Sequence, residues 1–184
     1  MKKISTLFET VFEPRYQVIN TVREDNKWVF ETGIPTQKFD GSACIILNGE
    51  LYKRYDVKKG KVVPEGAIPC QEADPVTGHH PHWIKCCIDK AEDKYHMQAF
   101  SLLEDKEEGA TYEICGEKFQ KNPEKIEGNL LIKHGSKVLQ ISDFSFESIK
   151  SFLETTDIEG IVFHDSSGLG RMCKIRKSDF GFIR

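Results

Sequence analysis

Two β-prone runs separated by Asn48-Gly49 give the clearest local pattern in the chain. The runs cover residues 43–47 and 50–55, and both are rich in β-branched, aromatic and aliphatic side chains. An Asn-Gly pair between such runs is the strongest short-range hairpin signal, because both residues readily adopt the positive φ values of a tight turn. The sequence therefore predicts an antiparallel hairpin over residues 43–55.

A second hairpin is predicted over residues 160–176, where two β-prone runs flank a serine- and glycine-rich segment. A turn centred near Ser167-Gly168 pairs Glu159 with Arg176 and Ile161 with Lys174. Because side chains alternate between the two faces of a strand, Glu159, Lys174 and Arg176 are then expected on one face. That face would carry two cations and one acid.

The other elements complete an α+β pattern dominated by antiparallel strands. Residues 111–115 and 130–132 read as strands, whereas residues 95–103 fit helix and strand equally well. Ser145 is a candidate N-cap for a helix whose apolar residues recur at helical spacing: Phe146, Ile149, Phe152 and Leu153. No repeat or linker interrupts the chain, so one domain is predicted over residues 1–184.

Composition and charge limit the classes of protein that fit. No apolar run approaches the roughly 18 residues of a membrane span, and polar residues soon after Lys2 and Lys3 argue against a secretory signal. Six scattered cysteines suit reduced thiols, so a cytoplasmic protein is expected. With a net charge of −3, contact with a polyanion requires a local basic surface, for which residues 53–61 and 171–184 are the candidates.

Lys38-Phe39-Asp40-Gly41 lies directly before the first hairpin. The lysine and the aspartate are two residues apart and so share one face of an extended strand, and the glycine lets the backbone approach a ligand closely. By itself a string of this kind is common in surface turns.

Residues 33–42 resemble the nucleophile motif of the covalent nucleotidyltransferases, the superfamily of ATP-dependent ligases and mRNA-capping enzymes. Later segments resemble the other motifs of that superfamily in order: Lys53-Arg54, then residues 111–116, 159–163 and 173–177. The sequence is most similar to a small family of 5′-to-3′ RNA ligases that includes a vertebrate member. Four segments within about residues 33 to 181 carry this similarity: residues 34–36, Glu113 with Asn122-Pro123, residues 132–135 and residues 159–164.

The resemblance implies a fold and an activity. The fold would be an antiparallel-sheet-rich nucleotidyltransferase domain, an ATP-grasp-like adenylation domain with helices packed on the sheets, without an appended oligonucleotide-binding barrel or C-terminal helical domain. Lys38 would attack the α-phosphate of ATP to give lysyl-AMP. The AMP would pass to the 5′-phosphate of an RNA, whose end would then be sealed to a 3′-hydroxyl. ATP and RNA are the implied partners, with no membrane and no indicated protein partner.

The residue types suit that chemistry. Free lysine has a pKa of about 10.4, so a lysine nucleophile needs cationic neighbours or desolvation to favour its neutral form. Cations also neutralise a reacting phosphate, and carboxylates hold Mg²⁺, for which Mn²⁺ can substitute. The predicted catalytic residues are Lys38, Asp40, Glu159 and Lys174; the predicted nucleotide contacts are Gln37, Lys38, Gly41, Arg54, Glu113, Glu159, Lys174 and Arg176; and the predicted metal ligands are Glu159 and Glu113.

Several alternatives stay open at the level of sequence. Glu117 competes with Glu113 as the acid of the third motif, and Ser42 to Cys44 stand where the superfamily usually has an arginine, which disfavours a DNA ligase. The histidines at 79, 80 and 82, with Cys86 and Cys87, suit either zinc or RNA. None of the phenylalanines at 144, 146 and 152 is assigned to adenine. The rival functions are a GTP-using capping enzyme, an adenylyltransferase with another acceptor, and a catalytically silent nucleic-acid-binding module of the same fold.

Overall fold

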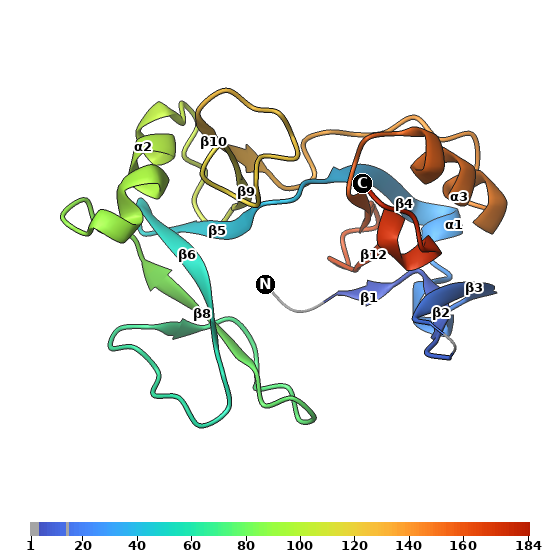
Figure 1. Cartoon of the computed structure of the whole chain (residues 1–184), viewed down its shortest axis with the longest axis horizontal. Helices are drawn as coiled ribbons and strands as arrows, with labels where there is room; N and C mark the ends of the chain where they lie inside the picture. Colours follow the sequence, from blue (N-terminus) through green and yellow to red (C-terminus); the bar gives the residue numbers. More distant parts are fainter. Residues whose placement is uncertain (1–3, 14) are drawn as a thin grey trace. The chain divides into compact units, whose positions relative to one another are not determined.

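Antiparallel strand pairing organises most of the chain in the computed structural model, which describes residues 4–13 and 15–184 (Figure 1). The charged Lys2 and Lys3 of the chain start lie outside these residues. The chain divides into two compact units. One unit is Asp40–His134, and the other joins the described residues up to Phe39 with Gly135–Arg184. The sequence predicted one domain over residues 1–184. The division into two compact units does not decide whether they form one domain, so this stays a prediction.

The Asp40–His134 unit is built on a six-stranded sheet in which every neighbouring pair is antiparallel. The strand order is β10-β9-β5-β6-β8-β7, and the helix α2 packs on the sheet against β10 and β6. A core that includes Cys44, Ile46 and Tyr112 lies on one face. The elements are β5 (Ser42–Leu47), β6 (Glu50–Val57), β7 (Ile68–Pro69), β8 (His80–Lys85), η2 (Ala91–Asp93), α2 (Lys94–Leu102), β9 (Thr111–Gly116) and β10 (Asn129–Lys133).

The second unit holds a four-stranded sheet of order β1-β12-β11-β4 and a separate β2-β3 pair. The pairing of β1 with β12 is parallel, and the other pairs in this unit are antiparallel. Its core joins Ile161, Phe163 and Ile175 of the sheet to Ile149 and Leu153 of α3. The elements are β1 (Ser5–Thr6), β2 (Phe8–Val11), β3 (Gln17–Val22), η1 (Glu24–Asn26), α1 (Val29–Thr32), β4 (Gly33–Lys38), α3 (Phe146–Thr155), β11 (Gly160–Asp165), β12 (Met172–Arg176) and η3 (Lys177–Phe180).

Most of the predicted elements are confirmed, as is the α+β class. Asn48 and Gly49 have φ values of 52° and 71° and join β5 to β6 in the predicted hairpin. Ser145 caps α3 by accepting a hydrogen bond from the backbone N–H of Ser148 at 3.3 Å. The segment that fitted helix and strand equally well is a helix, α2.

The predicted register of the second hairpin is wrong by one residue. Gly160 pairs with Arg176 and Val162 pairs with Lys174, whereas the sequence placed Glu159 and Ile161 opposite those two cations. The cause is the turn: the Asp165 carboxylate accepts hydrogen bonds from the backbone and hydroxyl of Ser167 and from Arg171 Nε, which sets Asp165 opposite Arg171. A one-residue slip reverses the face of every side chain in a strand.

Two expectations about composition can be compared with the described chain. All six cysteines fall within it, and all six are free thiols, with no disulfide. Among the helices of residues 4–13 and 15–184, none is long and apolar enough to cross a membrane.

The N-cap of α3 gives a test of the fold. Replacing Ser145 with alanine removes the side-chain acceptor for one orphan N–H, so we expect the free energy of unfolding to fall by about 1 kcal/mol in urea titrations. Ser151→Ala, at an exposed position inside the same helix, is the matched control and should change stability by less than about 0.5 kcal/mol. Equal effects of the two substitutions would contradict the capping assignment.

Candidate functional site

Lys38 ends β4 on the face of the four-stranded sheet that is turned away from the core. Across the strands it pairs with Gly160, which in turn pairs with Arg176. The next row runs from Thr36 through Val162 to Lys174. Directly opposed residues share a face, as do positions two apart along a strand. Lys38, Lys174 and Arg176 therefore lie on one face, brought together from two strands, β4 and β12, that are far apart in the sequence.

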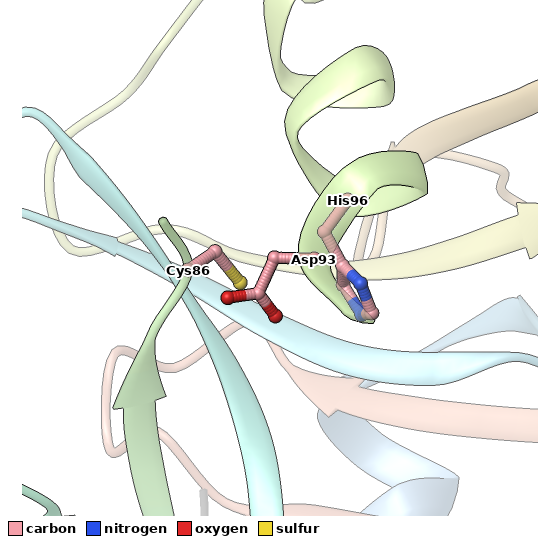
Figure 2. Close-up of side chains that lie close together, drawn as sticks. All are labelled: Cys86, Asp93 and His96. Carbon is pink, nitrogen blue, oxygen red and sulfur yellow. The ribbon is translucent and has the colours of Figure 1, made fainter. Parts of the chain in front are cut away.

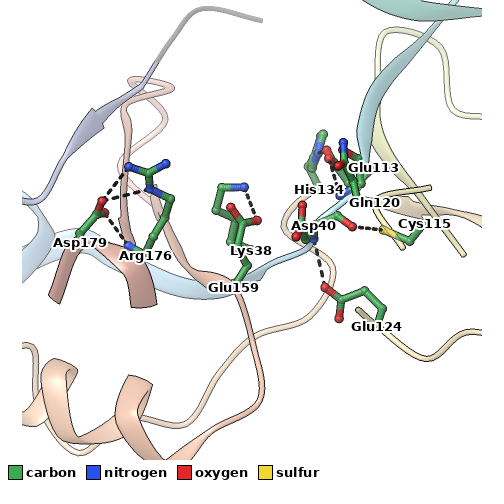
Figure 3. Close-up of polar contacts among 11 residues, drawn as sticks. Lys38, Asp40, Glu113, Cys115, Gln120, Glu124, His134, Glu159, Arg176 and Asp179 are labelled. Carbon is green, nitrogen blue, oxygen red and sulfur yellow. Dashed lines mark hydrogen bonds and ion pairs between the residues drawn. The ribbon is translucent and has the colours of Figure 1, made fainter. Parts of the chain in front are cut away.

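Glu159 forms an ion pair with Lys38. The Glu159 Oε2 and Lys38 Nζ atoms are 2.5 Å apart, and the two side chains are only 22% and 23% exposed (Figure 3). Glu159 stands directly before β11, where its carbonyl oxygen accepts a hydrogen bond from the backbone N–H of Lys177 at 2.8 Å. The predicted amine and acid are thus in contact, although the register predicted for Glu159 was wrong.

Gly160 permits this arrangement because it adds no side chain between Lys38 and Arg176. A Cβ at this position would lie 2.3 Å from the carbonyl oxygen of Ile175 and 2.8 Å from the Cα of Arg176. Both of those atoms belong to the backbone, so the clash cannot be relieved by a rotamer change. The close approach of β11 to β12 therefore requires glycine.

The two cations that β12 contributes to this face, Lys174 and Arg176, have different surroundings. Burial, followed by the charges of Arg176 and Lys38, lowers the pKa of Lys174. The guanidinium of Arg176 donates from Nε and Nη2 to Oδ1 of the buried Asp179, at 3.1 and 2.7 Å, and this pairing raises the pKa of Arg176 (Figure 3). These contacts use two of the five N–H donors of the guanidinium. The face thus concentrates positive charge that two acids only partly neutralise.

In the other unit a second polar group forms around Glu113. Its Oε1 accepts the backbone N–H of Gly41 at 3.2 Å, and its Oε2 lies 2.9 Å from Nε2 of His134 (Figure 3). The ring of His134 is oriented through Nδ1, which lies 2.9 Å from the hydroxyl of Thr111. Glu117, by contrast, is exposed, and among residues 4–13 and 15–184 its carboxylate accepts the backbone N–H of Gly128. This geometry favours Glu113 over Glu117 as the acid nearest the nucleophile motif.

The remaining predicted residues lie outside these two groups. Asp40 donates its backbone N–H to Glu124 at 3.0 Å. Arg54 lies on the same face of β6 as Ala43 of β5, the residue that pairs with Glu113, and its Nε is 3.3 Å from Asp56. Gln37 is buried on the core side of β4, away from the face that carries the Lys38 amine.

Sequence reasoning missed two residues that hold the groups together. The sequence singled out His134 only within residues 132–135, a segment similar to the RNA ligases. Once β9 and β10 are aligned, Thr111 and His134 lie on the same face of the sheet as Glu113. Asp179 follows Arg176 by three residues, a spacing that suits a local ion pair. Recognising His134 requires the register of β9 with β10, and recognising Asp179 requires the start of the short helix η3. The sequence alone defined neither.

Two sets of candidates have other surroundings. The rings of Phe144, Phe146 and Phe152 pack against the core, which explains their helical spacing without a ligand. His82 is buried and its Nδ1 lies 2.8 Å from the carbonyl oxygen of His80. Within the described ranges, one group of side chains lies close enough together to hold a metal ion. It consists of Cys86, Asp93 and His96, and it includes none of the histidines at 79, 80 and 82.

Comparison with known proteins does not assign the chain to a family. No family model matches the sequence, and no curated protein matches it either.

The steric role of Gly160 can be tested by substitution. Gly160→Ala should lower the free energy of unfolding by about 1–3 kcal/mol in urea titrations, because the added methyl group meets rigid backbone. Leu169→Ala, in the exposed turn of the same hairpin, should change stability by less than about 0.5 kcal/mol. A Gly160→Ala protein as stable as the control would show that β11 and β12 are not packed as described.

Proposed function

We propose that this chain is an ATP-dependent RNA ligase with a nucleotidyltransferase fold, and that it carries AMP on Lys38. The observation that supports the proposal best is the contact between the Lys38 amine and Glu159, on a sheet face that also holds Lys174 and Arg176. A nucleophilic amine, an acid and two phosphate-binding cations are the groups that nucleotidyl transfer to lysine needs. The order of the matching motifs along the sequence supports the same reading.

The cations have two tasks in this proposal. As the amine attacks, negative charge grows on the α-phosphate, and preorganised positive groups stabilise that charge most strongly where water is excluded. The half-buried Lys174 meets this condition. Arg176, fixed by Asp179, presents a guanidinium whose orientation is set before a phosphate arrives. In general, positive neighbours also favour the neutral form of an amine over its ammonium form.

The Lys38–Glu159 ion pair implies that activation begins with its opening. Attack on phosphorus requires a neutral amine with a free electron pair, so Glu159 has to release the Lys38 nitrogen before it can reach a phosphate. Glu159 offers hard carboxylate oxygens that suit Mg²⁺, and a bound Mg²⁺ supplies charge neutralisation for the triphosphate. Glu113 fits the role of metal ligand less well, because both of its oxygens already accept hydrogen bonds from Gly41 and His134.

The proposed reaction has three balanced steps. The Lys38 nitrogen bonds to the α-phosphorus and loses a proton to solvent, while pyrophosphate leaves with the electrons of the broken P–O bond. An oxygen of the RNA 5′-phosphate then bonds to the phosphorus of the AMP, and the P–N bond breaks as the lysine nitrogen takes up a proton from solvent. Finally a 3′-hydroxyl attacks that 5′-phosphate, loses its proton and releases AMP. Asp40, Gly41, Arg54 and Glu113 stay candidates for contacts to the nucleotide, whereas the Gln37 side chain faces the core.

Labelling with radioactive nucleotide tests the first step. With α-labelled ATP and Mg²⁺ or Mn²⁺, we expect the wild-type chain to retain label on a denaturing gel. Lys38→Arg should retain no label, even though arginine keeps the positive charge beside Glu159. Lys38→Ala should also retain no label. Labelling from GTP in place of ATP would indicate a capping-type enzyme, and no labelling from either nucleotide would indicate a silent binding module.

The electrostatic groups should affect the rate without being the attachment point. We expect Lys174→Ala and Glu159→Ala each to slow AMP attachment by at least about a hundredfold, because each removes a charge from the reacting phosphate or its metal. Lys150→Ala, on the partly exposed surface of α3, is a control that should label at the wild-type rate. Unchanged rates in both site variants would contradict the assigned roles.

The acceptor is tested by strand joining. A 5′-phosphorylated, labelled RNA oligonucleotide should be lengthened or circularised by the wild-type chain with ATP, and Lys38→Ala should leave it unchanged. A chain that takes up AMP but transfers it to no RNA end would instead indicate an adenylyltransferase with another acceptor.

A further inference from the structure

Three potential metal ligands converge where β8 ends and α2 begins. Cys86 follows β8 directly, Asp93 ends the short helix η2, and His96 lies in the first turn of α2. One ligand atom from each residue lies within 4.8 Å of the other two. Figure 2 shows the Cys86 sulfur and the Asp93 carboxylate directed toward one another beside the His96 ring. All three residues belong to the Asp40–His134 unit.

Two of the three residues are buried and the third is partly buried, which distinguishes the group from a surface cluster of acids. Cys86 is 3% exposed and Asp93 is fully buried. His96 Nδ1 is a buried nitrogen with no hydrogen-bond partner among the described residues. A buried polar atom without a partner is costly, so such an atom calls for an explanation such as a missing ion.

We propose that Cys86, Asp93 and His96 form a Zn²⁺ site. A thiolate, a carboxylate and an imidazole are the donors that zinc selects, and a set of three leaves a fourth position for water. Metal–ligand distances of about 2.0–2.3 Å place ligand atoms about 3–4 Å apart around one ion. Movements on the order of 1 Å would therefore close the present group around zinc.

Burial acts in opposite directions on the two titratable ligands. It lowers the pKa of His96, which favours the neutral imidazole that binds metals. Together with the charge of Asp93, it raises the pKa of Cys86 to about 12, which opposes formation of the thiolate. Because zinc binds cysteine as the thiolate, binding releases the thiol proton.

The local net charge around the group also favours binding of a cation. Lys53 is the local positive group, with its Nζ 2.5 Å from Asp93 and 3.1 Å from Glu92. One cation thus faces two acids, and exchanging the thiol proton for Zn²⁺ adds one net positive charge. Lys53 keeps Glu92 as a partner when Asp93 turns to the metal. The backbone N–H of Cys87, 2.9 Å from the other Asp93 oxygen, holds the carboxylate in place.

Titration of the full chain with Zn²⁺ tests the proposal, without ATP so that the result is independent of ligase activity. We expect one Zn²⁺ per chain, with release of a proton and a rise in melting temperature. Cys86→Ser and His96→Gln should each weaken binding by at least about tenfold. Cys87→Ser, which changes the adjacent thiol but keeps the backbone N–H, should bind like the wild type.

Co²⁺ provides a spectroscopic test of the site that can be made on the wild-type chain. Wild-type chain loaded with Co²⁺ should show a thiolate-to-metal charge-transfer band, and that band should persist in Cys87→Ser. Absence of the band, absence of stoichiometric Zn²⁺ binding, or a larger loss in Cys87→Ser than in Cys86→Ser would overturn the proposal. The last result would point instead to the neighbouring segment with His79, His80 and His82.

Discussion

The ion pair between Lys38 and Glu159 is the interaction on which this account of the site depends. It joins the end of β4 to the start of β11, and the strand pairing of Lys38 with Gly160 brings the two side chains together. The same pairing places Lys174 and Arg176 of β12 on the face of the amine. Without a glycine at position 160, β11 could not approach β12 as it does. The chemistry of the site and the packing of this sheet therefore have the same cause.

In each compact unit, a polar side chain is fixed by a partner to which the sequence assigned no role. Asp179 holds the guanidinium of Arg176 in one unit, and His134 holds the carboxylate of Glu113 in the other. Such supporting contacts set the direction of a side chain before a ligand binds. The chain passes from one unit to the other between Phe39 and Asp40 and again between His134 and Gly135.

Local signals in the sequence predicted most elements, whereas relations between strands were harder to predict. Asn48-Gly49 and the Ser145 cap act within a few residues, so their patterns identified a hairpin and a helix correctly. The register of β11 with β12 depends on the side chain of Asp165 inside the turn, which no periodicity reports. The contact of Glu113 with His134 likewise requires the alignment of β9 with β10. Residue types led to a hypothesis about the chemistry, whereas identifying side-chain partners required the fold.

We propose that the amine of Lys38 becomes bonded to phosphorus during turnover. Mass spectrometry of the intact chain after incubation with ATP and Mg²⁺, followed by peptide mapping, detects such a bond. We expect a mass increase of one AMP, carried by the peptide that contains Lys38. An unmodified chain, or AMP on a peptide that lacks Lys38, would contradict it.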